Sequence, residues 1–214
     1  MSIMKKTAYF GGSFNPPHAG HLGVAEGALL SGRTDAVWLA PAFRPPHKTG
    51  KPLTEFRHRA EMIRLLIGNR SGLELCDVED RLRLEPSYTI LILEHLERSE
   101  PDRQIQLLIG GDSLRQLHTW HRAEELAERF EILTYPRDGE TPALEELQQR
   151  WGTKTAEKLY GGVLSGEFFK ISSTNIRNGM ENPSNRVHIN KGSIPDAVWE
   201  YIQQQGLYRR KEDE

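Results

Sequence analysis

Hydrophobic and polar positions along the chain predict strands that alternate with helices. Short apolar runs bounded by glycine, proline or charged residues predict strands at residues 7–10, 35–40, 73–76, 104–109, 130–135 and 168–171. Helical periodicity between them predicts helices at residues 20–30, 54–67, 86–98, 143–159 and 195–205. This alternation predicts an α/β fold, a doubly wound and mostly parallel sheet with helices on both faces.

The ends of the predicted elements carry local signals. The segment 41–53 holds four of the twelve prolines, so it is predicted to be a loop, and Thr54 is expected to cap the helix after it. Gly206 is expected to end the last helix. Because 214 residues fit one α/β domain, we predict a single domain over residues 1–214, with residues 172–210 as its C-terminal helical part.

Composition and charge narrow the class of protein. Apolar residues make up 37% of the chain, which is enough for a packed core and too many for a disordered chain. The net charge of −2 creates no field that would draw the protein to nucleic acid or to an anionic membrane, so neither is predicted as a partner. The single cysteine, Cys76, and the absence of a signal-like or membrane-spanning stretch predict a cytoplasmic protein.

The segment after the first predicted strand suits a phosphate group. Residues 11–21 read Gly-Gly-Ser-Phe-Asn-Pro-Pro-His-Ala-Gly-His, and the glycine pair lets the backbone approach a bulky anion. His18 and His21 lie three residues apart at a helix start, so their imidazoles share one face beside amides that carry partial positive charge. Ligands of parallel sheets bind beyond the carboxyl ends of the strands. We therefore predict a phosphate-binding pocket at this turn.

Taken alone, the histidine pair would also fit an ordinary turn without a binding role, or a zinc site. A zinc site needs a third ligand with matched spacing. The nearest carboxylate, Glu26, lies more than a turn further along the helix and off that face. No metal site built from protein side chains is therefore predicted, and the position of the pair after a strand and two glycines favours the phosphate pocket.

A second polar cluster follows the last predicted strand. Residues 171–177 read Ile-Ser-Ser-Thr-Asn-Ile-Arg, in which Ser172, Ser173 or Thr174 is expected to cap a helix whose free amides face an anion. Arg177 lies one turn further on, where its guanidinium is suited to bidentate contact with phosphate. Taken alone, the segment is also an ordinary helix N-terminus. Its position after a strand favours the binding role.

These two segments resemble the HxGH and ISSTxIR signatures of the nucleotidylyltransferase superfamily. Further segments, Pro-Pro-His-Lys at 45–48, Pro-Ser-Tyr-Thr at 86–89, Gly-Gly-Asp-Ser at 110–113 and Thr-Trp-His at 119–121, resemble those of bacterial nicotinate-nucleotide adenylyltransferases. The resemblance covers nearly the whole chain. It implies a Rossmann-like fold and a reaction of NAD biosynthesis, in which nicotinate mononucleotide and ATP give nicotinate adenine dinucleotide and pyrophosphate.

The resemblance also implies roles for individual residues. Residues expected to take part directly in catalysis are His18, His21, Lys48 and Arg177. Residues expected to bind ATP are Gly11, Gly12, Ser13, Phe14, His18, His21, Gly110, Asp112, Ile171, Ser173, Thr174 and Arg177. Residues expected to bind nicotinate mononucleotide are Asn15, His47, Lys48, Ser87, Tyr88, Thr89, Asp112, Trp120 and His121. Within the last group, Trp120 is expected to stack on the pyridine ring.

The chemistry of adenylyl transfer fits this set of residues. The phosphate that attacks has a second pKa near 6, so it is largely dianionic at neutral pH and needs no general base. Holding two anions together and stabilising charge on the leaving group is a task for positioning and electrostatics. Mg²⁺ is expected to accompany ATP and to be held mostly by phosphate oxygens and water.

Two positions depart from the family pattern, and three alternative functions stay open. Gly179 stands where relatives often have a second arginine, and Asn15 stands where many have aspartate. The alternatives are a nicotinamide-mononucleotide adenylyltransferase, a pantetheine-phosphate adenylyltransferase and a nucleotide-binding sensor that has lost catalysis. The sequence does not fix the oligomeric state, and a homo-oligomer remains an option.

Overall fold

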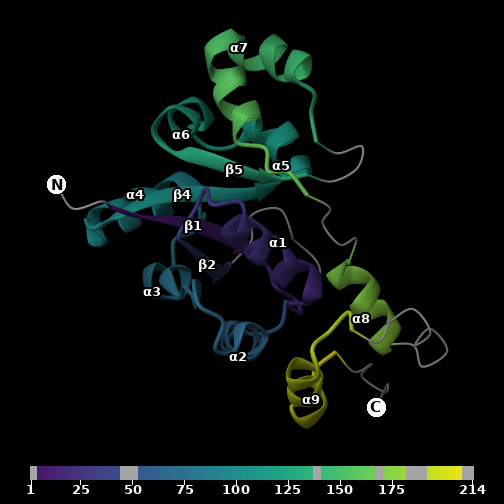
Figure 1. The fold of residues 1–214 in the computed structure, drawn as a ribbon. Coiled ribbons are helices and arrows are strands. Elements are labelled where there is room, and N and C mark those ends of the chain that lie inside the picture. The colour runs from purple at the N-terminus through teal and green to yellow at the C-terminus, as the bar shows by residue number, and fades with distance from the viewer. Residues whose placement is uncertain (1–3, 44–52, 137–140, 167–170, 182–191, 209–214) are drawn as a thin grey trace.

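The computed structural model describes residues 4–43, 53–136, 141–166, 171–181 and 192–208 (Figure 1). Within them, a single sheet has the strand order β3-β2-β1-β4-β5. The strands are β1 (Lys5–Gly12), β2 (Ala36–Pro41), β3 (Leu73–Leu75), β4 (Arg103–Gly110) and β5 (Glu131–Tyr135). All neighbouring strands are parallel. The sheet confirms the predicted doubly wound, parallel α/β fold.

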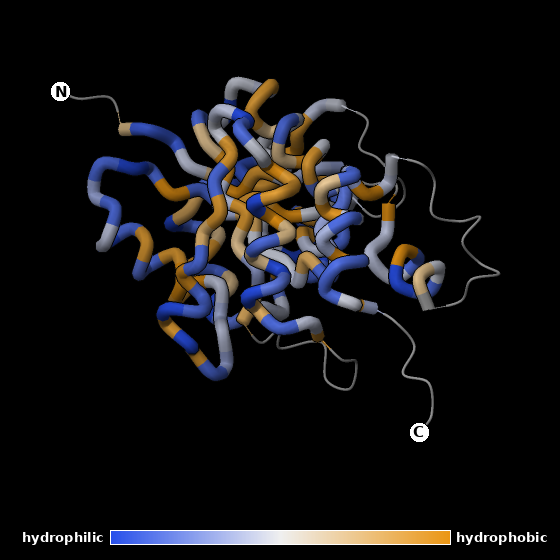
Figure 2. Tube along the Cα trace, turned by 90° about the horizontal axis from the view of Figure 1, so that it is seen from below, coloured by the Kyte–Doolittle hydropathy of each residue, from blue (hydrophilic) through white to orange (hydrophobic). Residues whose placement is uncertain are grey.

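Residues on the central strands are apolar on both sides because helices cover both faces of the sheet. Every residue of β2 is buried, as expected for a strand inside a parallel sheet. On β1, Ala8 and Phe10 belong to the core on one face and Tyr9 to the core on the other. Figure 2 shows hydrophobic residues gathered in the interior of the molecule, with polar ones toward its outside.

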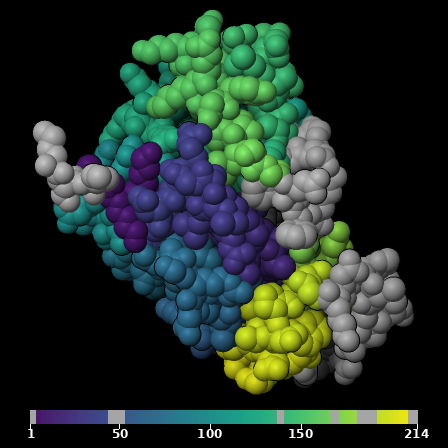
Figure 3. Space-filling view, viewed as in Figure 1, coloured from purple at the N-terminus to yellow at the C-terminus, as the bar shows by residue number. Residues whose placement is uncertain are grey.

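One face of the sheet carries the first two helices and the last two. These are α1 (Ala19–Leu30), α2 (Phe56–Ile67), α8 (Ser173–Glu181) and α9 (Asp196–Gln204). Their apolar side chains share one core, to which Met62, Ile176 and Val198 contribute from three different helices. In Figure 3, α9 lies against the part of the surface that α2 forms, and the His58 ring nitrogen Nδ1 lies 2.9 Å from the Tyr201 hydroxyl.

The opposite face carries the middle of the chain. It is covered by α3 (Val78–Leu82), α4 (Thr89–Ser99), α5 (Gly111–Gln116), the 3₁₀ turn η1 (Leu117–Thr119), α6 (Ala123–Arg129) and α7 (Leu144–Gly161). The chain therefore changes face between β3 and β4, and the switch falls between the neighbouring strands β1 and β4. Ligands bind at such switch points, beyond the carboxyl ends of the strands.

Several predicted boundaries differ from the structure. The expected cap by Thr54 is wrong, because α2 begins at Phe56 and the preceding residue, Glu55, makes no side-chain cap. The Thr54 backbone is engaged elsewhere, since its carbonyl accepts from Arg59 Nε at 2.8 Å. The helix predicted to end at Leu159 reaches Gly161, with a break at Gly152. Of the sixth strand predicted at 168–171, only Ile171 lies among the described residues, and it is outside any strand.

The short helices of the second face were not predicted. α3, α5 and α6 are five to seven residues long, so they contain too few turns for a helical period to show in the sequence. No helix in the described part of the chain is long and apolar enough to cross a membrane.

Candidate active site

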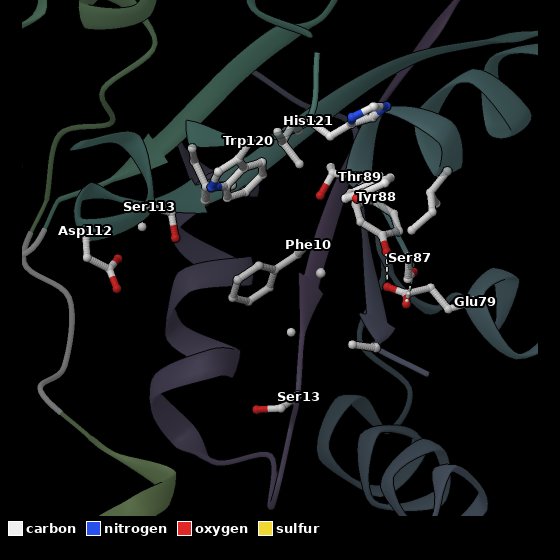
Figure 4. A pocket seen from close by; sticks show the side chains of 18 of the residues that line it. Phe10, Ser13, Glu79, Ser87, Tyr88, Thr89, Asp112, Ser113, Trp120 and His121 are labelled. Atoms are coloured by element: carbon white, nitrogen blue, oxygen red, sulfur yellow. Dashed lines mark hydrogen bonds between the residues drawn. The ribbon is translucent and has the colours of Figure 1, made fainter. Parts of the chain in front are cut away.

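A cavity of about 560 Å³ opens at the switch point between β1 and β4 (Figure 4). Eleven of the residues predicted to bind substrates line it: Gly11, Gly12, Ser13, His21, Ser87, Tyr88, Thr89, Gly110, Asp112, Trp120 and His121. Residues that sequence analysis did not assign to the site also line it, among them Tyr9, Phe10, Glu79, Ser113, Thr119 and Tyr135. The cavity therefore joins the ends of β1, β4 and β5 to the starts of α1, α4 and α5.

The histidine pair lies where β1 turns into α1. His18 immediately precedes the helix and His21 lies in its first turn, so the two rings lie against each other, with centroids 3.7 Å apart and planes tilted by 31°. His18 is only 4% exposed, whereas His21 is half-buried and lines the cavity. The His18 backbone N–H donates to His21 Nδ1 at 3.2 Å. This bond makes Nδ1 an acceptor and leaves the ring proton on Nε2, which makes Nε2–H the donor of His21.

Phe14 supports the histidine pair from the core. Its backbone has φ 44, and its side chain is fully buried. The ring meets Phe10 edge-on, with centroids 5.6 Å apart, and lies 4.7 Å from the ring of His21. The side chain of Phe14 therefore packs behind His21, and only the backbone at this position is placed to meet a ligand.

The two signature segments, far apart in sequence, lie together in the structure. The Ser173 hydroxyl donates to the Pro16 carbonyl at 3.0 Å, and Arg177 Nη1 donates to the Asn15 carbonyl at 2.6 Å. α8 begins at Ser173 and runs through Gly179 to Glu181. The hydroxyl of Ser173 thus ties α8 to the turn, and of the three predicted cap residues Ser172 is the one directly before the helix.

Close packing also holds the other residues of the second signature segment, residues 171–177. Arg177 Nη2 donates to the Thr174 hydroxyl at 3.2 Å, so the Arg177 guanidinium lies between Thr174 and the β1–α1 turn. Ile171 packs on α1, and a Cβ added to Gly20 would lie 3.3 Å from the Ile171 Cβ. A glycine at position 20 therefore lets this segment approach α1 closely. Ile171, Ser173, Thr174 and Arg177 do not line the cavity itself.

Asn15 also lies outside the cavity and links the turn to the C-terminal part of the chain. It is 5% exposed, and its Oδ1 accepts from the Tyr208 hydroxyl at 2.7 Å and from the Thr54 N–H at 3.4 Å. The amide oxygen of asparagine supplies the acceptor that both donors need. This contact gives position 15 a clear structural use with asparagine in place of aspartate.

The other end of the cavity is formed by the start of α4 and the segment after η1. Ser87, Tyr88 and Thr89 lie at the N-terminus of α4, where free backbone amides carry partial positive charge. The rings of Tyr88 and His121 stack, with centroids 4.1 Å apart and planes at 20°. Trp120 is half-buried and lines the same part of the cavity (Figure 4).

Glu79 is a buried carboxylate of the cavity that sequence analysis missed. It is 6% exposed and accepts from the Tyr9 hydroxyl at 2.8 Å, the Ser87 hydroxyl at 2.8 Å and the Phe43 N–H at 3.0 Å. Burial, reinforced by the carboxylate of Glu79, raises the pKa of Tyr9 well above its ordinary value. The hydroxyl of Tyr9 therefore stays protonated and remains a donor.

At the end of β4, Gly110 lets the side chains of Asp112 and Tyr135 approach the backbone more closely than a residue with a Cβ would. A Cβ there would collide with the Asp112 carboxylate and would lie 2.9 Å from the Tyr135 hydroxyl. Asp112 in the first turn of α5 thus faces the cavity next to the strand end. The predicted role of Asp112 in ligand binding stays a prediction, and the structure places the residue in the lining of the cavity.

The described residues hold no cluster of side chains for a metal ion. Across these ranges, no three His, Cys, Asp or Glu side chains gather where they would hold one. Two of the predicted site residues, His47 and Lys48, lie outside the described residues.

The parallel sheet and the cavity at its switch point are those of the Rossmann-like class of nucleotide-binding proteins. Residues 9–179 match the family model described as cytidylyltransferase-like. The nicotinate-nucleotide adenylyltransferase of Bacillus subtilis (strain 168) is 33% identical over 210 residues, covering 96% of this chain and 99% of the relative. The chain belongs to the cytidylyltransferase-like family and, within it, to the nicotinate-nucleotide adenylyltransferases.

A solved structure supports the fold independently. The nicotinic acid mononucleotide adenylyltransferase of Plasmodium falciparum, complexed with NaAD, superposes with a TM-score of 0.74 at 21% identity. The match covers 95% of this chain and 97% of the other. At that level of identity the likeness concerns the fold.

Proposed function

We propose that this protein transfers the adenylyl group of ATP to nicotinate mononucleotide, forming nicotinate adenine dinucleotide and pyrophosphate in NAD biosynthesis. The observation that carries the proposal is the docking of α8 on the β1–α1 turn, through Ser173 with Pro16 and Arg177 with Asn15. Through these contacts the two signature segments lie together next to the turn that borders the cavity, which supports a shared role in phosphate binding. The relatives of the same family, matched over nearly the full chain, support the choice of substrates.

The reaction is a displacement at phosphorus. An oxygen of the mononucleotide phosphate forms a bond to the α-phosphorus of ATP, and the bond from that phosphorus to the bridging oxygen of the β-phosphate breaks. Pyrophosphate leaves with the electron pair. Both substrates are anions, so the protein has to hold them together and stabilise charge on the leaving group.

The ATP phosphates are assigned to the β1–α1 turn and the start of α8. Gly11, Gly12 and Ser13 line the cavity at the end of β1, where the backbone is open to a phosphate. Nε2–H of His21 is the donor assigned to the same region, and the buried ring of His18 lies behind it. Ser173, Thr174 and Arg177 are assigned to the departing phosphates, which requires Arg177 to exchange the Asn15 carbonyl for phosphate oxygen.

Nicotinate mononucleotide is assigned to the other end of the cavity. Trp120 offers an aromatic face to the pyridine ring. The backbone amides at Thr89, in the first turn of α4, and at His121 are suited to the nicotinate carboxylate because both an amide donor and a helix N-terminus favour an anion. Lys48 and His47 are proposed from the sequence to contact the mononucleotide phosphate.

Mg²⁺ is proposed as the partner of ATP. When bound, it neutralises charge on the phosphate oxygens. Asp112 is the carboxylate that lines the cavity beside the phosphate end, and Glu79 is committed to three donors. The chain's own contribution there is therefore the donor groups of the turn and of α8. We also propose that residues 1–214 form one domain, because α8 and α9 share a core with α1 and α2.

A steady-state comparison of substrates tests the proposal. Purified protein is assayed for pyrophosphate release with ATP and Mg²⁺, using either nicotinate or nicotinamide mononucleotide. We expect turnover with the nicotinate compound and a much higher kcat/KM than with the amide. An equal or higher kcat/KM with nicotinamide mononucleotide would mean that the amide is the substrate. No pyrophosphate release with either mononucleotide would favour a binding protein without transferase activity.

A further inference from the structure

Arg59, in the first turn of α2, is buried directly behind the β1–α1 turn, to which the ATP phosphates are assigned. It is 1% exposed, although arginine is among the residues least often found fully buried. Nη1 donates to the Ser13 carbonyl at 3.0 Å, and Nε donates to the Thr54 carbonyl at 2.8 Å. The guanidinium carbon lies 5.5 Å from the centre of the Phe56 ring.

The charge of Arg59 has no ion-pair partner in the described part of the chain. Both hydrogen-bond acceptors are neutral carbonyls, although a buried cation is costly unless an anion compensates it. Burial lowers the pKa of Arg59 to about 10, which still leaves the side chain positively charged at neutral pH. Glu79, the carboxylate that acts on Arg59 through space, makes its hydrogen bonds to other donors and forms no ion pair with Arg59. A buried cation beside an anion-binding turn is a fixed electrostatic contribution to that site.

The bond to Ser13 also sets the orientation of the turn. In a trans peptide the carbonyl of one residue and the N–H of the next point in opposite directions. Because the Ser13 carbonyl faces Arg59, the Phe14 N–H points away from α2. Ser13 lines the cavity and no residue of α2 does, so this orientation suits a donor toward bound phosphate.

We propose that Arg59 is a positioning residue for the polyphosphate of ATP, which orients the Ser13–Phe14 peptide and supplies fixed positive charge from behind the turn. The expected changes in KM rest on the proposed adenylyl transfer. The expected change in stabilisation by ATP rests on ATP binding alone. It goes beyond the signature segments because Arg59 belongs to neither of them. The mononucleotide end of the cavity, formed by α4 and the segment after η1, is a separate part of the structure.

Three substitutions of Arg59 separate charge, hydrogen bonding and packing. Arg59→Lys keeps the charge, Arg59→Gln keeps a donor without the charge, and Arg59→Met keeps only the bulk. Arg57→Met is the matched control, because Arg57 lies in the same turn of α2, is exposed and pairs with Glu55. The KM values for ATP and for the mononucleotide are measured separately, with the midpoint of thermal unfolding for each variant with and without ATP.

We expect Arg59→Gln and Arg59→Met to raise the KM for ATP by about tenfold or more, while the KM for the mononucleotide stays within about twofold. Arg59→Lys should lie within about threefold of the unmodified protein because the charge remains. The stabilisation of the fold by ATP should shrink in the two neutral variants and persist in Arg57→Met.

Two results would overturn the role of Arg59. One is an unchanged KM for ATP in both neutral variants, or an equal rise in the two KM values. The other is failure of both neutral variants to fold, which would make the residue purely structural. If the unmodified protein shows no adenylyl transfer, the proposed function fails, but the thermal shift with ATP still decides whether Arg59 serves ATP binding.

Discussion

Glu79→Gln replaces the buried carboxylate of the cavity with an amide of the same shape. In the structure, Oε1 accepts from the Tyr9 hydroxyl, and Oε2 accepts from the Ser87 hydroxyl and the Phe43 N–H. A glutamine oxygen can replace Oε2 as a neutral acceptor. The amide NH₂ would then face the hydroxyl of Tyr9, which has to rotate to accept. The substitution therefore removes charge from three hydrogen bonds without leaving a cavity.

The magnitude follows from the three bonds. A hydrogen bond to a charged group contributes about 1.5–3 kcal/mol and a neutral one about 0.5–1.5 kcal/mol, so each bond loses about 1 kcal/mol. Part of that loss of about 3 kcal/mol is offset because a buried neutral amide costs less to desolvate than a carboxylate. We expect the free energy of unfolding to fall by about 1–3 kcal/mol, which lowers the unfolding midpoint by about 2–10 °C in a chain of this size.

The substitution Glu79→Gln should affect the binding of the mononucleotide more than the binding of ATP. Ser87 lies two residues before Thr89, at the end of the cavity assigned to nicotinate mononucleotide, so loosening Glu79 should raise the KM for the mononucleotide more than that for ATP. Urea unfolding gives the stability change and steady-state kinetics give the two KM values. Glu128→Gln, an exposed position on α6, is the control for loss of one negative charge. Unchanged stability in Glu79→Gln would refute the idea of a charge held by three donors.

Three further outcomes follow from the site. His21→Ala should lower kcat by about a hundredfold with little change in the unfolding midpoint, because it removes a donor to the transition state; a lower midpoint with unchanged kcat would contradict this. Trp120→Ala should weaken the mononucleotide by about 1–3 kcal/mol in a binding titration and ATP much less, if stacking resembles that on bases; equal weakening would indicate packing alone. Burial raises the pKa of Tyr208 to about 12, so its protonated hydroxyl contributes to the stability of the folded state. This contribution is complete below the ordinary tyrosine pKa of about 10, and it is lost as the pH rises through about 12. Tyr208→Phe should cost about 1 kcal/mol at neutral pH and flatten the alkaline loss in urea titrations at a series of pH values; an identical alkaline profile would exclude Tyr208 as its source.

The parts of the fold that sequence analysis predicted are those with a continuous apolar run or a repeating pattern. The strand Ala36–Pro41 is short and wholly buried, so it shows as an apolar run, and α2 has a clear apolar face, so its helical period shows in the sequence. The pairing of the two signature segments also followed from sequence, because both come at a strand end or a helix start at the same edge. Their actual contacts, from Ser173 to Pro16 and from Arg177 to Asn15, confirm that they lie together.

What sequence analysis missed are polar residues whose role depends on distant neighbours. Glu79 lies in Val78–Leu82, a helix of five residues among other acids and arginines, where it reads as part of a solvent-exposed face. Its burial depends on Tyr9 from β1 and Ser87 before α4. The same reason applies to Thr54, which suits a cap by its place ahead of α2, but whose backbone is used by tertiary contacts with Arg59 and Asn15.

The conformation of the β1–α1 turn is a tertiary property, although its sequence is the clearest signature in the chain. Three successive anchors hold it: Arg59 of α2 on the Ser13 carbonyl, Tyr208 and Arg177 on Asn15, and Ser173 on the Pro16 carbonyl. The anchors come from α2, α8 and the segment after α9. Arg59, Arg177 and Ser173 donate to backbone carbonyls of the turn, and Tyr208 donates to the side chain of Asn15, so the opposite side of the turn remains open. A short turn can thus be rigid before ATP binds, which reduces the ordering cost of binding. The conformation of residues 11–21 therefore depends on residues as distant as Tyr208.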